Sequence, residues 1–206
     1  MPNTARLIDD LQHQPDFPEA VEELQKRLEQ EKAKRQEYYA LVHEDVKAEF
    51  INGEIVYQSP VKRKHWKVSI RLSSSLHNYV EENDLGEVGV EKVMISLSRN
   101  DYEPDIVFFL KEKVDQFQPD QMHFPAPDFV VEIVSDSTEG RDRGIKFDDY
   151  AAHGVQEYWI VDPREQSVEQ YLLRGKTFEL HQKLVGSGQL NSRVIEGFVL
   201  DIGSLF

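Results

Sequence analysis

The stretch from Pro127 to Asp162, PDFVVEIVSDSTEGRDRGIKFDDYAAHGVQEYWIVD, decides the fold. It begins with an apolar segment, Phe129–Ser135, that predicts a buried strand. A loop and a helix over Arg141–His153 follow, and Glu157–Val161 predicts a second buried strand. The helix is expected to close at Gly154, because glycine readily takes the left-handed conformation just past a helix end.

An acidic residue, Glu132, stands in the middle of the first of these strands. Burying a carboxylate without compensation costs several kcal/mol, so such a residue is usually paired, protonated or bound to a metal. On the following helix Asp142, Lys146 and Tyr150 are spaced by four residues and share one face. Lys146 is therefore the candidate partner of Glu132, either in an active site or in a purely structural ion pair. Asp142 and Lys146 could equally form an ordinary exposed pair.

Length and composition indicate a water-soluble protein with one domain and an extension. The chain has 206 residues, of which 39% are hydrophobic and 30% are charged. It contains no run of about 18 or more apolar residues, which a membrane-spanning helix would need. Its first residues lack the apolar core of a signal peptide. The absence of cysteine excludes disulfides and thiolate zinc sites, and we expect a cytoplasmic protein.

The charge is strongly acidic, with a net value of −14 and an isoelectric point near 4.9. Such a field opposes binding to a polyanion unless basic residues are gathered locally. One dense basic cluster opens a predicted helix whose apolar face is expected to contain Trp66, Ile70, Leu76 and Val80. The cluster is either a solvated helix start or a patch that faces phosphate. Its members are Lys62, Arg63, Lys64, His65, Lys67 and Arg71.

The N-terminal segment is predicted to be an extension, with residues 1–36 outside a domain that covers residues 37–206. Residues 1–17 show no clear period and are expected to form a loose arm. Pro18–Val42 predicts a helix with a thin apolar stripe that includes Val21, Leu24 and Leu28. Its dense mixed charge favours a solvated helix, and a dimerising coiled coil is the alternative.

The remaining pattern predicts mainly strands. Asn52-Gly53 marks the turn of a hairpin within Ala48–Ser59, because both residues tolerate positive φ. Gly86–Leu97 is expected to form one strand, and Lys111–Pro125 a surface loop in which Phe117 and Phe124 can tuck inward. Other predicted strands are Ile106–Leu110, a hairpin of Val168–Arg174 and Thr177–Leu184, and short closing segments at Val194-Ile195 and Phe198–Ile202.

A second acidic residue, Asp105, stands at the start of the strand Ile106–Leu110. If this strand is a neighbour of Phe129–Ser135, the carboxylates of Asp105 and Glu132 can converge on a hard divalent cation such as magnesium. Asp105 could otherwise cap a turn after Pro104. We interpret Tyr150, Tyr158 and Trp159 as core side chains rather than as base-stacking ones.

Several motifs in order resemble the Uma2-type proteins, which are similar to the PD-(D/E)XK nuclease superfamily. The resemblance covers roughly residues 37–174. It implies an α/β, restriction-endonuclease-like core with a central mixed sheet flanked by helices, and Mg²⁺- or Mn²⁺-dependent cleavage of phosphodiester bonds in DNA. The matching motifs are INGEIVYQSP followed by KHW, EPDIVFF, PDFVVEIVSDST, the helix with Asp142 and Lys146, and GVQEYWIVDP.

The resemblance assigns roles residue by residue. Asp105 corresponds to the acid of the Pro-Asp motif and Glu132 to the acid of the next strand, and both would hold the metal. The usual Glu-X-Lys is Glu132-Ile133-Val134 in this chain, so Lys146 would have to replace the missing lysine. Glu54 and His65 are further members by the same resemblance. Without it, His65 would be interpreted as a surface residue.

Two functions follow for the chain, a magnesium-dependent endonuclease acting on DNA or a catalytically inactive binding or scaffolding protein with the nuclease fold. The acidic charge and the missing lysine favour the second, whereas Asp105, Glu132 and Lys146 favour the first. Because similar nucleases pair, we expect a homodimer, and we expect no membrane association. The candidate nucleic-acid contacts are Lys62, Arg63, Lys64, Lys67 and Arg71.

Overall fold

A central sheet of six strands forms the core of the computed structural model, which describes residues 2–42 and 46–206. In spatial order its strands are β11 (Thr177–Val185), β10 (Ser167–Arg174), β9 (Glu157–Asp162), β8 (Phe129–Ile133), β6 (Ile106–Leu110) and β3 (Gly86–Val90). Within this sheet β8 and β9 pair in parallel, and the other neighbouring strands pair antiparallel. The predicted α/β fold with a central mixed sheet is confirmed.

The parallel pair β8 and β9 is joined by a helical crossover, as parallel neighbours require. The crossover consists of two helices, α5 (Glu139–Asp142) and α6 (Ile145–Ala152), where the sequence predicted one. The break falls at Gly144, where an added Cβ would lie 2.7 Å from the Gly140 carbonyl oxygen. Gly154 follows α6 with a φ of +85°, so the predicted end of the helix is confirmed.

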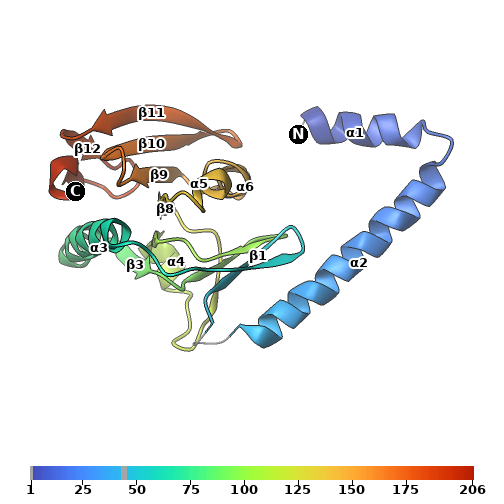
Figure 1. Cartoon of the computed structure of the whole chain (residues 1–206), viewed down its shortest axis with the longest axis horizontal. Coiled ribbons are helices and arrows are strands. Elements are labelled where there is room, and N and C mark those ends of the chain that lie inside the picture. The colour runs from blue at the N-terminus through green and yellow to red at the C-terminus, as the bar shows by residue number, and fades with distance from the viewer. Residues whose placement is uncertain (1, 43–45) are drawn as a thin grey trace.

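Side chains of the central sheet alternate between two cores. Phe129, Val131 and Ile133 of β8 face α3 (Arg63–Glu82), which covers one side of the sheet (Figure 1). Val130 and Val134 belong to the opposite core, together with side chains of α6. Glu132 lies between them in sequence and therefore points to the α6 side, as its position in the strand predicts.

A second sheet contributes to the core on the α6 side. Its order is β2 (Glu54–Tyr57), β1 (Ala48–Ile51), β5 (Asp101–Tyr102), β4 (Met94–Ser96) and β7 (His123–Phe124). The predicted hairpin turn is confirmed, with φ values of +50° at Asn52 and +81° at Gly53. The predicted single strand Gly86–Leu97 is wrong: β3 and β4 lie in different sheets. The chain turns between them at Glu91 and Lys92, which both have positive φ.

The loop after β6 and the C-terminal segment agree only in part with the predictions. The loop after β6 contains a short helix, α4 (Lys111–Val114), besides β7, and Phe117 and Phe124 pack against the core as expected. The C-terminal segment pairs β12 (Gln189–Asn191) with β13 (Val199–Asp201) and ends in the 3-10 turn Ile202–Ser204. Val194 and Ile195 are not in a strand, although Ile195 is buried in the core.

The phase of α3 differs from the prediction. Val68, Leu72, Leu76 and Val80 recur at intervals of four and are buried against the sheet. Trp66 and Ile70 precede Val68 and Leu72 by two positions, which is roughly 200° around a helix with 3.6 residues per turn. Both therefore point outward, with 47% of Trp66 and 58% of Ile70 exposed. The predicted inward orientation of these two residues is wrong.

The N-terminal segment is helical throughout most of its length. α1 (Pro2–Gln12) occupies the segment expected to be a loose arm, and α2 (Phe17–Leu41) extends away from the two sheets (Figure 1). α2 is continuous across residues 36 and 37, and the domain division proposed there stays a prediction. In the part of the chain that the structure describes, no helix is long and apolar enough to cross a bilayer.

The C-terminal half of α2 is attached to the domain by polar contacts. Arg35 Nε lies 2.7 Å from Asp101 Oδ2, and the Tyr38 hydroxyl donates to the Ala48 carbonyl at 2.7 Å. The N-terminal half makes no comparable attachment, since Leu24 and Leu28 are each about half exposed. We expected this apolar stripe to pack either on the domain or on a second copy of the chain. Leu24 and Leu28 do not pack on the domain, and packing on a second copy stays a prediction.

Candidate active site

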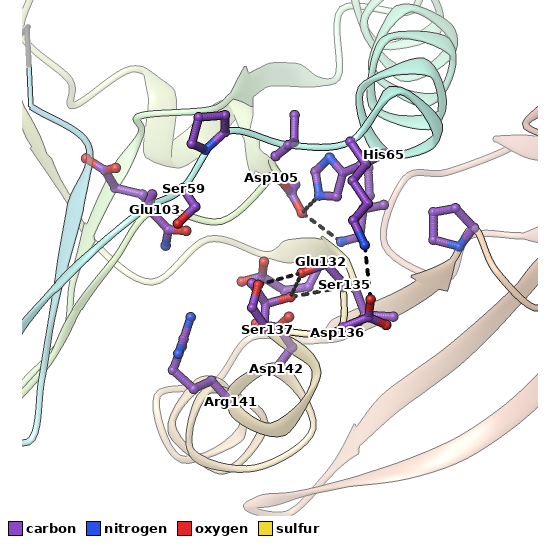
Figure 2. A pocket seen from close by; sticks show the side chains of 18 of the residues that line it. Ser59, His65, Glu103, Asp105, Glu132, Ser135, Asp136, Ser137, Arg141 and Asp142 are labelled. Atoms are coloured by element: carbon purple, nitrogen blue, oxygen red, sulfur yellow. Dashed lines mark hydrogen bonds and ion pairs between the residues drawn. The ribbon is translucent and has the colours of Figure 1, made fainter.

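A cavity of about 540 Å³ opens where β6 begins, β8 ends and α3 begins. Figure 2 shows His65 and Asp105 on one side of it, and Glu132, Ser135 and Asp142 on the other. Lys146 also lines the cavity. The structure thus brings together Asp105, Glu132 and Lys146, which the sequence placed on three separate elements.

The base of the cavity holds one buried ammonium among three carboxylates. Lys146 Nζ lies 2.7 Å from Glu49 Oε1, 3.0 Å from Glu132 Oε1 and 3.4 Å from Asp142 Oδ1. All four side chains are buried. The spacing of α6 and α5 brings Lys146 over β8, whose alternation turns Glu132 toward it. A single positive charge is therefore shared among three carboxyl groups.

Burial governs the protonation of this cluster. It raises the pKa of Glu132 well above the ordinary value and also raises the pKa of Asp142. Burial opposes the charged form of Lys146, but the carboxylates of Glu132, Glu49 and Asp142 outweigh it and raise the lysine pKa. Lys146 is therefore an ammonium at neutral pH.

Asp105 is fixed against the end of the neighbouring strand. Its Oδ2 accepts a hydrogen bond from the Ile133 N–H at 2.7 Å and lies 3.4 Å from His65 Nε2. β6 pairs antiparallel with β8, with Ile106 opposite Val131, so the same register places Asp105 opposite Glu132. Burial lowers the pKa of His65, but its hydrogen bond and charge contact with Asp105 raise it above the ordinary value overall.

The acidic residue of the hairpin that reaches the site is Glu49, and the expectation for Glu54 is wrong. The Glu54 side chain is 75% exposed and pairs with Lys34 of α2 at 3.0 Å. β2 is the edge strand of its sheet, whereas β1 lies between β2 and β5 and is buried along its whole length. An acid between Ala48 and Phe50 in such a strand is the same kind of signal that identified Glu132.

Another buried carboxylate that the sequence prediction missed is Glu103, which lines the cavity. Burial raises the pKa of Glu103 to about 7. Its own N–H donates to Glu49 Oε1 at 3.1 Å, which connects the start of β6 with β1. The sequence signal that could have identified Glu103 is its position two residues before Asp105.

The basic cluster divides into three groups. Lys62 and Lys64 line the cavity, and Lys62 Nζ lies 3.1 Å from Asp136 Oδ2. Arg63 and Lys67 stand on the outside of α3 and do not line it. Arg71 does not line the cavity, and its Nη1 donates to the carbonyls of Leu205 and Phe206 at 3.1 and 2.7 Å, so its role as a phosphate contact stays a prediction. These hydrogen bonds anchor the C-terminal residues.

The donor set suits a hard cation. Among the described residues, three buried carboxylate oxygens have no hydrogen-bond partner: Glu49 Oε2, Glu103 Oε2 and Asp142 Oδ1. In the same part of the chain, no group of three or more histidine or acidic side chains is arranged to hold a metal. Magnesium, however, is usually held by one or two carboxylates and keeps several waters. Asp105, directly before β6, and Glu132 on β8 are two carboxylates at the cavity that would meet this requirement.

Comparison with known proteins gives a family match over most of the chain. The model of the family described as "Uma2: Putative restriction endonuclease" matches residues 35–203. A crystal structure described as "a putative nuclease belonging to DUF820" from Anabaena variabilis superposes with a TM-score of 0.71. That likeness covers 83% of this chain and 96% of the other at 20% identity, so it supports the fold alone.

Two curated relatives come from Synechocystis, and both are uncharacterised. The protein slr1290 is 30% identical over 128 residues, which is 61% of this chain and 65% of the relative. The protein sll1609 is 28% identical over 144 residues, which is 68% of this chain and 80% of the relative. The chain thus spans less than two thirds of the length of slr1290.

Proposed function

Because the chain belongs to the Uma2 family of putative restriction endonucleases, we propose that it is a metal-dependent endonuclease that hydrolyses phosphodiester bonds in DNA. The observation that carries this proposal is the cavity in which Asp105, Glu132 and Lys146 meet. Asp105 and Glu132 would hold Mg²⁺ or Mn²⁺. When bound, such an ion polarises the scissile phosphate and lowers the pKa of a bound water.

The chain's own residues supply orientation and charge. The Ile133 N–H and His65 hold Asp105 in place, and Lys146 holds Glu132 while offsetting part of the negative charge at the base. Lys146 thereby occupies the electrostatic role of the lysine that Val134 replaces. The ammonium groups of Lys62 and Lys64 attract the phosphate to an otherwise acidic protein, and His65 would stand near it as a hydrogen-bond donor.

A direct test is cleavage of supercoiled plasmid by the purified full chain. We expect nicked and linear products with magnesium or manganese, loss of cleavage on addition of EDTA, and recovery with excess magnesium. Single- and double-stranded DNA and RNA should be assayed in parallel. A well-folded protein that cuts none of them with either metal would contradict the proposal.

A second candidate function is a binding or scaffolding protein that retains the fold without catalysis. The observation in its favour is the buried Val134 at the position of the usual lysine, together with a net charge of −14. In this case the contact between Lys146 and Glu132 is purely structural. Titration calorimetry separates the two functions, since a scaffold has no need to bind magnesium.

We also propose that the chain is a homodimer joined through its N-terminal helices. Leu7 and Ile8 of α1 and Leu24 and Leu28 of α2 are all more than half exposed, and a second copy would bury them. Replacing Leu24 and Leu28 by serine should shift the sedimentation equilibrium to monomer. Leu180→Ser, at a similarly exposed position on β11, is the matched control. A wild-type protein that stays monomeric at high concentration would contradict this prediction.

A further inference from the structure

The outer face of α3 carries an exposed aromatic side chain beside the cavity. We define this outer face as Arg63, Trp66, Lys67 and Ile70, which recur at the spacing of one helix face. Trp66 directly follows His65, which lines the cavity. Tryptophan is highly buried on average in folded proteins. The other tryptophan follows that rule, because Trp159 is fully buried.

The surroundings of Trp66 are basic in a protein that is otherwise acidic. Lys62 pairs with Asp136 but keeps 71% of its side chain exposed. Within the described residues, no ion pair involves Arg63, Lys64 or Lys67. These cations run from the outer face to the cavity, since Lys62 and Lys64 line it. The outer face therefore complements a phosphate backbone, and Trp66 adds an apolar plane to it.

We propose that Trp66 is a stacking platform for an unpaired base of a nucleic acid strand that passes along Arg63 and Lys67 into the cavity. This inference rests on the proposed nuclease function and narrows its substrate class to DNA with single-stranded or distorted segments. In an intact duplex the bases are already stacked on each other, so the indole has no free base face to contact. An aromatic plane among cations is the usual arrangement for binding single strands.

Charge also favours nucleic acid over a second copy of the chain as the occupant. Two outer faces brought together around a two-fold axis would place Arg63 and Lys67 close to their own copies. Such like-charge contacts weaken association. A nucleic acid strand presents the opposite charge and an aromatic surface together.

The two tryptophans give a selective optical test. Trp66 is exposed and Trp159 is buried, so quenching by an added oligonucleotide reports on Trp66. The full chain is titrated in EDTA, which prevents cleavage, with a short deoxythymidine oligonucleotide and with a duplex of equal length. We expect strong quenching by the single strand and little by the duplex. Trp66→Phe should remove the quenching while it keeps an aromatic plane.

Affinity measurements with a labelled oligonucleotide test the energetic role. Trp66→Ala should weaken single-strand binding about 5- to 150-fold, which corresponds to the usual range for stacking on one base. Trp66→Phe should retain most of the affinity, and Leu180→Ala, at an exposed site on β11, should retain all of it. Duplex binding should change much less than single-strand binding in Trp66→Ala. Because Trp66 is exposed, its variants should melt at the wild-type temperature.

Several outcomes would overturn the inference. Unchanged single-strand affinity in Trp66→Ala would exclude a stacking platform, and equal losses for single strand and duplex would exclude selectivity for unpaired bases. Loss of dimerisation in Trp66→Ala with unchanged oligonucleotide binding would assign the outer face to contact between copies. The binding assays contain no metal, so they are independent of cleavage. Selective loss of single-strand binding in a protein that cuts nothing would leave the inference standing and remove the proposed function.

Discussion

Replacing Lys146 by methionine should lower the free energy of unfolding by about 3–5 kcal/mol, because it leaves buried carboxylates without their positive partner. In the native protein the ammonium lies within 3.4 Å of Glu49, Glu132 and Asp142. Because methionine fills much of the space of the lysine side chain, the loss of unfolding free energy reports mainly on removal of the ammonium charge. Urea denaturation at fixed pH measures it.

The pH dependence of this loss follows from the direction of the pKa shifts. Burial raises the pKa of Glu132 and Asp142 in the folded state. A carboxyl group with a raised folded-state pKa favours folding while it is protonated, and this contribution declines as the pH rises above its unfolded value. Without the ammonium these groups are harder still to ionise. The difference in stability between wild type and Lys146→Met should therefore widen as the pH rises above about 4, the ordinary pKa of a carboxyl group in the unfolded chain.

Two further variants make the result specific. Lys32→Met removes an exposed lysine that pairs with Glu29 at 2.8 Å, and it should cost less than about 1 kcal/mol. Adding Glu132→Gln to Lys146→Met should recover part of the loss, because it removes one of the unpaired carboxylates. A small and pH-independent loss of unfolding free energy in Lys146→Met would show that electrostatic attraction does not stabilise the cluster.

Substitution of the site carboxylates should have the largest effect on cleavage. Asp105→Asn and Glu132→Gln are expected to abolish magnesium binding by calorimetry and plasmid cleavage together, since both are proposed ligands. Glu49→Gln should lower cleavage by about 10²–10³-fold, the usual cost of losing one preorganised charge, while magnesium still binds. Glu49 acts as a positioning residue in this account, because its carboxylate holds Lys146 at 2.7 Å.

The matched control for this prediction is Glu54→Gln on the facing strand of the same hairpin. Glu54 is exposed and pairs with Lys34 outside the cavity, so its replacement should leave cleavage unchanged. The reverse result, with loss at Glu54 and none at Glu49, would contradict the geometric assignment. Because Glu49 is fully buried, its replacement can also destabilise the protein. The cleavage rates should therefore be compared under conditions in which every variant is folded, as judged by its unfolding midpoint.

The central elements were predictable because their chemistry is local. An acid within an apolar strand, as at Glu132, indicates a buried partner whatever the fold, and Lys146 four residues after Asp142 was the nearest cation. Residue type also predicted the positive φ values of Gly154, Asn52 and Gly53, and the structure confirms them. The family resemblance supplied the sheet arrangement, which no local pattern contains.

The errors arose where tertiary contacts decide between local alternatives. The break between β3 and β4 lies at Glu91 and Lys92, whose positive φ values have no signal in residue type. Trp66 is apolar at helical spacing, but the phase of α3 follows the row that begins at Val68. Glu54 was assigned through the family resemblance, and only the pairing of β1 with β5 shows that the strand with Glu49 is the internal one of the hairpin.

The hydrogen bond from the Ile133 N–H to Asp105 has an evolutionary consequence. It ties an acidic side chain to the main chain of the adjacent strand, so the separation of Asp105 from Glu132 is set by β-ladder geometry rather than by neighbouring side chains. Mutations around the opening can then accumulate without altering that separation. A lineage of such proteins could exchange one target for another while inheriting the same pair of acids unchanged.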